Sequence, residues 1–302
     1  MQIVKDASTK TITLTQPALI QQVLQDIGIT PSSKGKDTPV DAILYADSDG
    51  PARQEKWNYR SVIGKLNYLA NNTRPDISMA VHQCACFCTN PKAVHDLAVK
   101  RIAQYLLATA DKGLVLTPSA DMALNMYVDA YFAGQWHKEY AELRDNVLSR
   151  TEYVILFCDC PVVWCSKLQS EIVLSTTESE YIALSTDLRD LLPLCRILHD
   201  ISTKSFISLQ PTIPSCKMCP DNLPPSKVFE DNMACIVLAT SDTHFKPRTK
   251  HISLKFHHFQ DYVKNGIIHI LKIGTSNNMA DIFTKPLGRI KLQHLRQLLM
   301  GW

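Results

Sequence analysis

The hydrophobic residues of this 302-residue chain change their period partway along the sequence, from a helical period to the alternation of strands. Up to about residue 113 they recur as on the buried face of an amphipathic helix. From Leu124 onward they alternate with polar residues over short runs, which is typical of half-buried strands. Hydrophobic residues make up 45% of the chain and can fill a proper core, in one large or two medium domains. We therefore expect an α-rich part over residues 1–120 and a sheet-forming part over residues 121–302.

The first part is predicted to contain a strand and several helices. Residues 11–15 are rich in β-branched side chains, which favours a strand. A helix is expected from Pro17, because proline suits the first helical position. Residues 31–53 are rich in Ser, Asp and Pro and have weak periodicity, so we expect a loop or linker there. The further helices are expected over residues 57–69, 77–88 and 91–109, with Gly113 ending the last of them.

The second part is predicted to alternate strands with helices. Its longest helix is expected over residues 177–199, with Pro193 kinking or interrupting it near its end. A shorter helix is expected to start at Asn232. This order of elements predicts an α/β or α+β fold, with helices on the faces of a sheet. The strands are expected at 124–131, 152–157, 162–165, 227–230 and 267–273, and the remaining helices at 254–265 and 290–299.

Four acidic residues lie at predicted strand ends and helix starts of the second part: Asp129, Glu180, Asp231 and Asp281. Carboxylate oxygens are the ligands that hard divalent cations prefer. Carboxylates gathered in one place repel one another, so a metal ion or a proton has to neutralise them. Such a cluster suits phosphodiester chemistry assisted by two metal ions.

Charge and cysteine content narrow the class of protein further. The formal net charge is only +3, so a nucleic-acid-binding surface has to be local. The chain has ten cysteines, no export signal at its start and no run of 18 apolar residues. We therefore expect reduced thiols in an intracellular protein that does not enter a membrane.

Cys216 and Cys219 have the spacing of a zinc turn, within an irregular proline-rich insertion over residues 206–225. A second ligand pair at comparable spacing is absent, although Cys158 and Cys160, or His199, could supply one. Free thiols are the default interpretation.

Several short motifs occur in a fixed order along the chain, at residues 59–69, 73–77, 127–130, 164–169, 175–181, 231–232, 248–252 and 280–285. In this order they resemble the C-terminal part of a copia-type LTR retrotransposon polyprotein. The first two motifs resemble the segment that follows the reverse transcriptase palm. The other six resemble the ribonuclease H domain of such elements.

The resemblance implies a fold and a reaction. Residues 1–120 would be an α-rich thumb or connection remnant of the reverse transcriptase, and residues 121–302 a ribonuclease H-like mixed sheet flanked by helices. The implied reaction is hydrolysis of the RNA strand of an RNA–DNA hybrid with two Mg²⁺ ions, or Mn²⁺ in their place. The implied partners are the hybrid and the upstream reverse transcriptase segment, in the cytoplasm or the nucleus.

The four acidic residues fall on the metal-binding carboxylates of that family. Asp129 would bridge both ions, Glu180 and Asp231 would complete one coordination shell, and Asp281 would belong to the other. Glu178 is the alternative to Glu180. The resemblance favours Glu180, because in ribonuclease H proteins an apolar helical run directly follows the metal-binding glutamate, as it follows Glu180 here. Glu178 would point about 160° away on a straight helix.

Contacts to the nucleic acid are implied for two further sets of residues. A basic loop between Asp231 and Asp281 would hold phosphates, and one of its histidines would protonate the leaving group or assist product release. Lys100 and Arg101 would either contact the hybrid or form a solvated helix face. The implied nucleic-acid-binding residues are Arg248, Lys250, His251, Ser166 and Lys167.

The chain departs from the family pattern in several places. Tyr131 and Glu152 stand where the family usually has an aspartate and a glycine, and the proline-rich insertion is longer than expected. No adjacent Asp-Asp pair occurs, so we expect no polymerase activity. Two alternatives to an active nuclease remain open. One is a catalytically inactive remnant that still binds nucleic acid, and the other is a different nuclease of the same general fold, such as an integrase or resolvase.

Overall fold

The chain folds into two units that interleave along the sequence, in a computed structural model that describes all residues except 135, 141, 143, 205–224 and 242–256. The first unit contains residues 1–117, 133–147 and 282–302, and the second contains residues 118–132 and 148–281. Residues 282–302 thus pack with the first unit, whereas the expected division places them with the second part.

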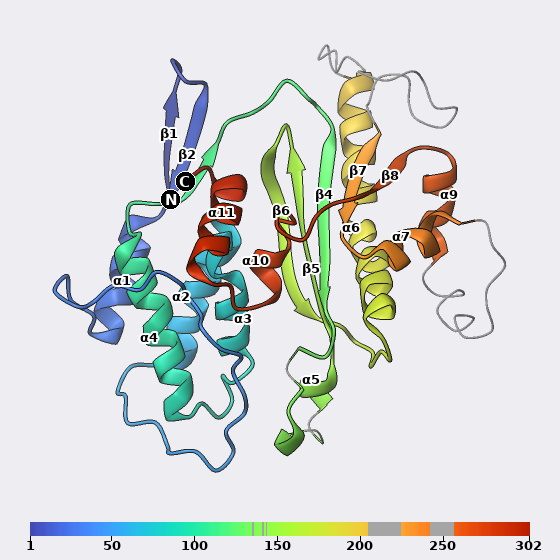
Figure 1. The fold of residues 1–302 in the computed structure, drawn as a ribbon. Helices are drawn as coiled ribbons and strands as arrows, with labels where there is room; N and C mark the ends of the chain where they lie inside the picture. The colour runs from blue at the N-terminus through green and yellow to red at the C-terminus, as the bar shows by residue number, and fades with distance from the viewer. Residues whose placement is uncertain (135, 141, 143, 205–224, 242–256) are drawn as a thin grey trace. The chain divides into compact units, whose positions relative to one another are not determined.

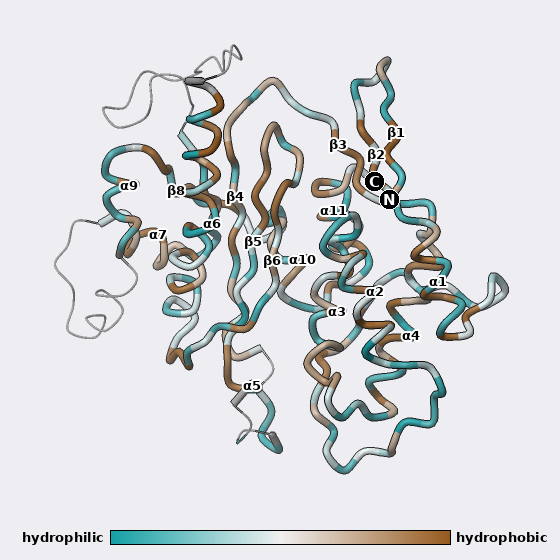
Figure 2. Tube along the Cα trace, turned by 180° about the vertical axis from the view of Figure 1, so that it is seen from behind, coloured by the Kyte–Doolittle hydropathy of each residue, from teal (hydrophilic) through white to brown (hydrophobic). Residues whose placement is uncertain are grey.

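The helices of the first unit lie close to where the hydrophobic period predicts them. Helix α1 (Pro17–Ile27) begins at the expected proline, and the side chain of Asn58 caps α2 (Tyr59–Asn72) by accepting a 3.0 Å hydrogen bond from Ser61 N. Figure 2 shows hydrophilic and hydrophobic residues alternating along α1 and α4, as expected of amphipathic helices. The other helical elements of this unit are η1 (Pro75–Ile77), α3 (Ser78–Ala85), α4 (Ala93–Ala108), η2 (Lys138–Tyr140), α5 (Arg144–Val147) and α11 (Arg289–Met300).

A small antiparallel sheet completes the first unit, in the order β1 (Gln2–Asp6), β2 (Thr11–Thr15), β3 (Leu114–Leu116). Only the middle strand is predicted from the sequence. The expectation that Gly113 ends the helix before it is wrong, because α4 already ends at Ala108. Gly113 instead allows close strand approach, since a Cβ there would lie 1.9 Å from Leu14 O.

The loop between α1 and α2 is held on α4 by ion pairs. Arg101 pairs with Asp41 at 2.7 Å, and Lys100 pairs with Glu55. Lys100 and Arg101 therefore bind the loop of their own unit instead of forming a purely solvated helix face.

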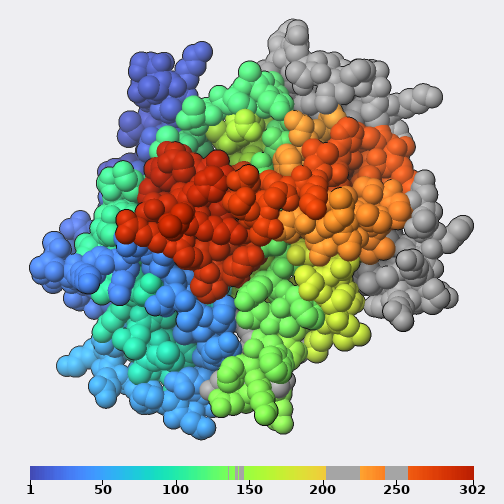
Figure 3. All heavy atoms as spheres, in the orientation of Figure 1, coloured from blue at the N-terminus to red at the C-terminus, as the bar shows by residue number. Residues whose placement is uncertain are grey.

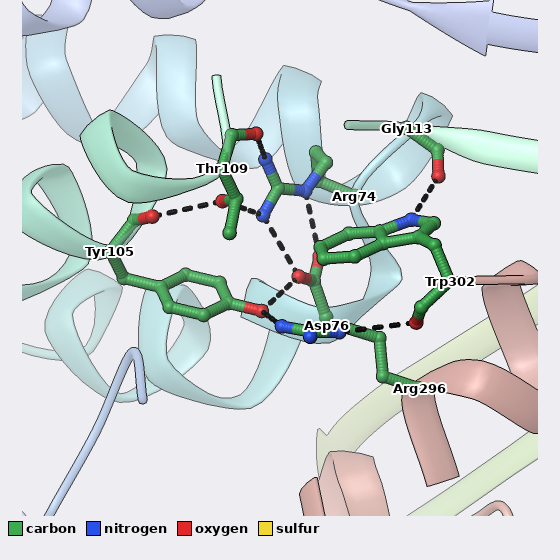
Figure 4. Close-up of polar contacts among 7 residues, drawn as sticks. All are labelled: Arg74, Asp76, Tyr105, Thr109, Gly113, Arg296 and Trp302. Atoms are coloured by element: carbon green, nitrogen blue, oxygen red, sulfur yellow. Dashed lines mark hydrogen bonds and ion pairs between the residues drawn. The ribbon is translucent and has the colours of Figure 1, made fainter. Parts of the chain in front are cut away.

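A buried network joins the C-terminal helix α11 to the rest of the first unit (Figure 4). Arg74 and Asp76 form a fully buried ion pair at 2.9 Å. The Tyr105 hydroxyl donates a 2.5 Å hydrogen bond to Asp76, and Arg296 of α11 donates one of 2.8 Å to that hydroxyl. Arg296 also stacks on the Trp302 ring at 3.8 Å. The segment that carries α11, red in Figure 3, forms part of the visible surface of this unit.

The second unit is built on a mixed five-stranded sheet in the order β6-β5-β4-β7-β8, so its class is the predicted mixed α/β (Figure 1). Strands β4, β5 and β6 pair antiparallel, whereas β4, β7 and β8 pair parallel. The sequence predicts all five, with ends displaced by a few residues. Their bounds are β4 (Leu124–Tyr131), β5 (Arg150–Phe157), β6 (Cys160–Leu168), β7 (Ser226–Glu230) and β8 (Ile268–Lys272).

Helix α6 (Thr176–Lys204) packs against one face of this sheet, and its buried residues share a core with Met126, Val128 and Ile155. The expected interruption at Pro193 does not occur, because the helix continues to Lys204. The remaining helical elements of the unit are α7 (Met233–Thr240), η4 (His257–Phe259) and α9 (Gln260–Lys264), and α10 (Asp281–Thr284) starts at its last residue. None of the helices in the described part of the chain combines the length and apolar character that crossing a membrane requires.

Candidate carboxylate metal centre

Three of the four predicted carboxylates converge in the second unit. Asp129, Glu180 and Asp231 each offer an oxygen atom, and these oxygens all lie within 4.8 Å of one another. Asp129 lies near the end of β4, and Asp231 directly follows the neighbouring parallel strand β7. Parallel strands end at the same edge of a sheet, which is why these two residues meet.

Burial and mutual repulsion shape the protonation of this cluster. The Asp129 and Glu180 residues are each only 4% exposed, and Asp231 is half-buried. Burial raises the pKa of Glu180 well above its usual range, and the negative charges of Glu230, Asp129, Asp231 and Glu152 raise it further. The group therefore holds a proton at neutral pH unless a cation neutralises the cluster.

The start of α6 separates the roles of the two candidate glutamates. The Glu178 carboxylate accepts a 2.9 Å hydrogen bond from Leu174 N, and Glu178 N donates one of 3.2 Å to Ser175 Oγ. These two hydrogen bonds cap the start of α6. Glu180, two residues later, is the glutamate of this pair that lies in the cluster.

Gln169 connects the end of β6 to the start of α6, and sequence reasoning assigned it no role. Its amide nitrogen donates 2.9 Å hydrogen bonds to Thr151 Oγ1 and to Ser179 O. Because Ser179 precedes Glu180, this buried amide positions the first turns of α6 relative to β5.

Asp231 and Asn232 form the junction between β7 and α7. Thr275 Oγ1 donates a 2.8 Å hydrogen bond to Asp231 Oδ2, which orients the carboxylate. The Asn232 side chain accepts hydrogen bonds from Ala234 N and Cys235 N and thereby caps α7 at the predicted start.

Asp281 is fully buried at the start of α10, but it is outside the three-residue group. The segment before it is fixed to β4, because Asn278 Nδ2 donates a 2.8 Å hydrogen bond to Val128 O. Asn278 Oδ1 also accepts a 3.2 Å hydrogen bond from Ala280 N. Val128 directly precedes Asp129, so the segment that ends at Asp281 is anchored next to the cluster.

The other predicted site residues are only partly within the described chain. Ser166 accepts a 3.4 Å hydrogen bond from Arg150 Nη1 and lies opposite Glu152 in the sheet. Burial raises the pKa of Asp187 on α6 well above its usual range, and the positive charge of Lys167 offsets part of this rise. Arg248, Lys250 and His251 lie outside the described residues, as do Cys216 and Cys219.

Three buried acids near the cluster were not among the predicted site residues: Glu152, Asp187 and Glu230. The alternation along β7 places Glu230 on the buried side, and Asp187 lies two helical turns after Glu180 on the same face of α6. Glu152 lies directly opposite Asp129 across β4 and β5. Periodicity could have found the first two acids, whereas finding Glu152 requires the strand register.

The cysteines give no second candidate centre within the described ranges. Cys158, Cys160 and the other cysteines there form no disulfide bond, and the carboxylate group is the one set with metal-ligand spacing that these ranges contain.

The chain is similar to the retrovirus-related Pol polyprotein from transposon RE2 of Arabidopsis thaliana, with 30% identity over 78% of this chain and 14% of the polyprotein. Similarity to the Pol polyprotein from transposon TNT 1-94 of Nicotiana tabacum covers 99% of this chain and 21% of that protein, at 31% identity. A shorter match at 37% identity, to the secreted RxLR effector protein 161 of Plasmopara viticola, covers 42% of this chain and 84% of the relative. The chain thus spans between 14% and 21% of the length of the two polyproteins. No family model matches the chain, and no solved structure matches it either.

Proposed function

The chain belongs to the family of retrovirus-related Pol polyproteins from copia-type transposons, and on this premise we propose that its second unit hydrolyses the RNA strand of RNA–DNA hybrids. The fold proposed for this unit is that of a ribonuclease H. The observation that carries the proposal is the convergence of Asp129, Glu180 and Asp231 within 4.8 Å. The first unit is proposed to be the remnant of the reverse transcriptase that precedes this nuclease.

The donor set fits a magnesium centre. Oxygens that share one Mg²⁺ lie at most about 4.2 Å apart, since Mg–O distances are about 2.1 Å. The oxygens of Asp129, Glu180 and Asp231 lie within 4.8 Å of one another, which is close to this limit. Without a cation the carboxylates repel one another, so a slightly larger separation is expected. Glu180 Oε2 is buried and makes no hydrogen bond within the described part of the chain, so a cation would supply the missing partner. We propose that Asp281 is a ligand of a second Mg²⁺ ion. Mn²⁺ could take the place of Mg²⁺ at both positions.

When bound, the ions would supply Lewis acidity that activates water and stabilises the leaving 3′ oxygen. The protein residues bind and orient: Asp129 and Glu180 provide buried negative charge, and Thr275 holds the Asp231 carboxylate in place. Selectivity for RNA would come from 2′-hydroxyls in the wide minor groove of the hybrid. From the family resemblance, we propose phosphate contacts by Arg248, Lys250 and His251, with Ser166 and Lys167 as further contacts.

An inactive nucleic-acid-binding remnant is the second candidate, favoured by Tyr131 at a position where the family usually has an acid, and by the enlarged proline-rich insertion. Such a protein would bind the hybrid and leave it intact.

The test is to incubate the full chain and Mg²⁺ with a hybrid whose RNA strand is labelled, beside double-stranded RNA and double-stranded DNA. We expect cleavage of the RNA in the hybrid alone. Asp129→Asn should lower the rate at least about a hundredfold, the loss typical of one electrostatic group at an active site. Equal cleavage by parent and variant would trace the activity to a contaminant, and binding without cleavage would favour the inactive remnant.

A further inference from the structure

A buried ion pair lies on the sheet face that carries Asp129. Arg150 Nε is 3.6 Å from Glu152 Oε1, and the two side chains are 3% and 0% exposed. Arg150 Nη1 also donates a 3.4 Å hydrogen bond to Ser166 Oγ on the next strand. The function proposed above assigns no role to Arg150 or Glu152.

The strand register places this pair beside the candidate metal centre. Glu152 is directly opposite Asp129 across β4 and β5, and Arg150 is directly opposite Tyr131. Successive side chains of a strand alternate between the two faces, so these four residues share one face. Arg150 is the diagonal neighbour of Asp129, and diagonal residues are about 7–8 Å apart, within reach of a long side chain. The guanidinium can therefore interact with Asp129 as well as with Glu152.

A buried guanidinium keeps its charge and requires a negative partner. If position 152 carried no charge, the carboxylate next along this face would be that of Asp129. Arg150 would then compete with a divalent cation for Asp129. The charge of Glu152 removes this competition, and it also adds to the negative potential at the cluster, where it raises the pKa of Glu180.

We propose that Glu152 is a positioning residue of the metal centre, which offsets the charge of Arg150 and so leaves Asp129 available to the divalent cation. The inference rests on the function proposed above. Glu152 acts through Arg150 and does not have to touch the metal.

The experiment measures Mn²⁺ binding to the full chain by the electron paramagnetic resonance signal of free Mn²⁺, with no substrate present. Glu152→Gln should weaken binding about tenfold, in the range found for residues that orient metal ligands. The double variant Arg150→Gln/Glu152→Gln removes the competing charge as well, so its affinity should return to within about threefold of the parent if the two residues act as a coupled pair. The Mg²⁺ concentration for half-maximal hybrid cleavage should shift in the same pattern.

Unchanged binding in Glu152→Gln would overturn the inference. So would a double variant as weak as the single one, because Glu152 would then act independently of Arg150. If Glu152→Gln does not fold, the double variant Tyr131→Asp/Glu152→Gln tests the inference instead. It places a new carboxylate directly opposite Arg150, which can offset the arginine charge in place of Glu152. Binding by that variant within about threefold of the parent supports the inference, and tenfold weaker binding contradicts it. Because no substrate is needed, the result stands whether or not the hybrid is cleaved.

Discussion

Glu178 and Glu180 are two positions apart on one helix and lie in different environments. The first caps the helix, and the second is buried among other carboxylates. Glu180→Gln removes a charge from the cluster and should lower the rate of hybrid cleavage at least about a hundredfold. Glu178→Gln is the matched control, because a glutamine at this position can still accept the hydrogen bond from Leu174 N.

Steady-state cleavage rates of the two variants, measured at equal folded fraction, check this prediction. Comparable losses in both variants would show that the start of α6 matters as a structure and would remove Glu180 from the proposed centre.

The raised pKa of Glu180 predicts how stability changes with pH. The folded state keeps a proton that the unfolded chain releases, so the contribution of Glu180 to the free energy of unfolding should be highest at low pH and fall as pH rises above the ordinary glutamate pKa. The fall is about 1.4 kcal/mol per pH unit for each proton retained, and it ends above the folded-state pKa. Mg²⁺ neutralises the cluster and should flatten this dependence.

Urea unfolding between pH 5.5 and 8, in chelator and in Mg²⁺, measures the effect. Glu180→Gln cannot release this proton and should show a shallower slope than the parent in chelator. A parent and a variant with the same slope would contradict the assignment of the shift to Glu180.

Three of the four carboxylates predicted from the sequence converge in the structure, and the fourth, Asp281, is outside their group. The helical period separates Glu180 from Glu178, and the ends of two parallel strands bring Asp129 and Asp231 together. Whether Asp281 enters the same group depends on how a distant segment docks on β4, which no local pattern encodes. The position of Glu152 opposite Asp129 depends on the register between β4 and β5, which no local pattern encodes either.

Among the elements, η1 and α4 are joined by the Tyr105 hydroxyl of α4, which donates a 2.5 Å hydrogen bond to Asp76, the partner of Arg74 in the buried ion pair. Asp76→Asn leaves a buried guanidinium without its carboxylate and should destabilise the first unit by about 3–5 kcal/mol. The control is Lys65→Met, which breaks the more exposed 2.6 Å pair with Asp26 and should cost less than about 1 kcal/mol. Urea unfolding of both variants measures the difference, and similar losses would contradict the buried network as the anchor of α4.

Elements with strong hydrophobic periodicity were predicted well, and those without it were missed. Helices α1, α6 and α11 lie close to their predicted ranges because each has one buried apolar face. Strand β1 was not predicted, since all of its residues are exposed and it has no buried alternation. Pro193 does not end α6, because residues after it, such as Leu194 and Leu198, still pack against the core of the second unit.

At the scale of the whole molecule, the interleaving of the two units was not predictable from the sequence. The period of α11 indicates that Leu292, Leu295 and Leu299 are buried, but not which core they join. Tyr105 and Arg296 decide this through their hydrogen bond, which joins residues far apart in the sequence. The expected boundary near residue 120 follows the change of hydrophobic period, and such a boundary cannot show that the chain returns to the first unit.

We propose that Asp129, Glu180 and Asp231 together form a divalent-cation centre. This centre is tested by a titration of the full chain with Mn²⁺, in which electron paramagnetic resonance measures the free ion. We expect saturable binding by the parent and by Glu178→Gln, and binding at least about tenfold weaker in Asp129→Asn and Glu180→Gln. Equal binding by the parent and both cluster variants would contradict it.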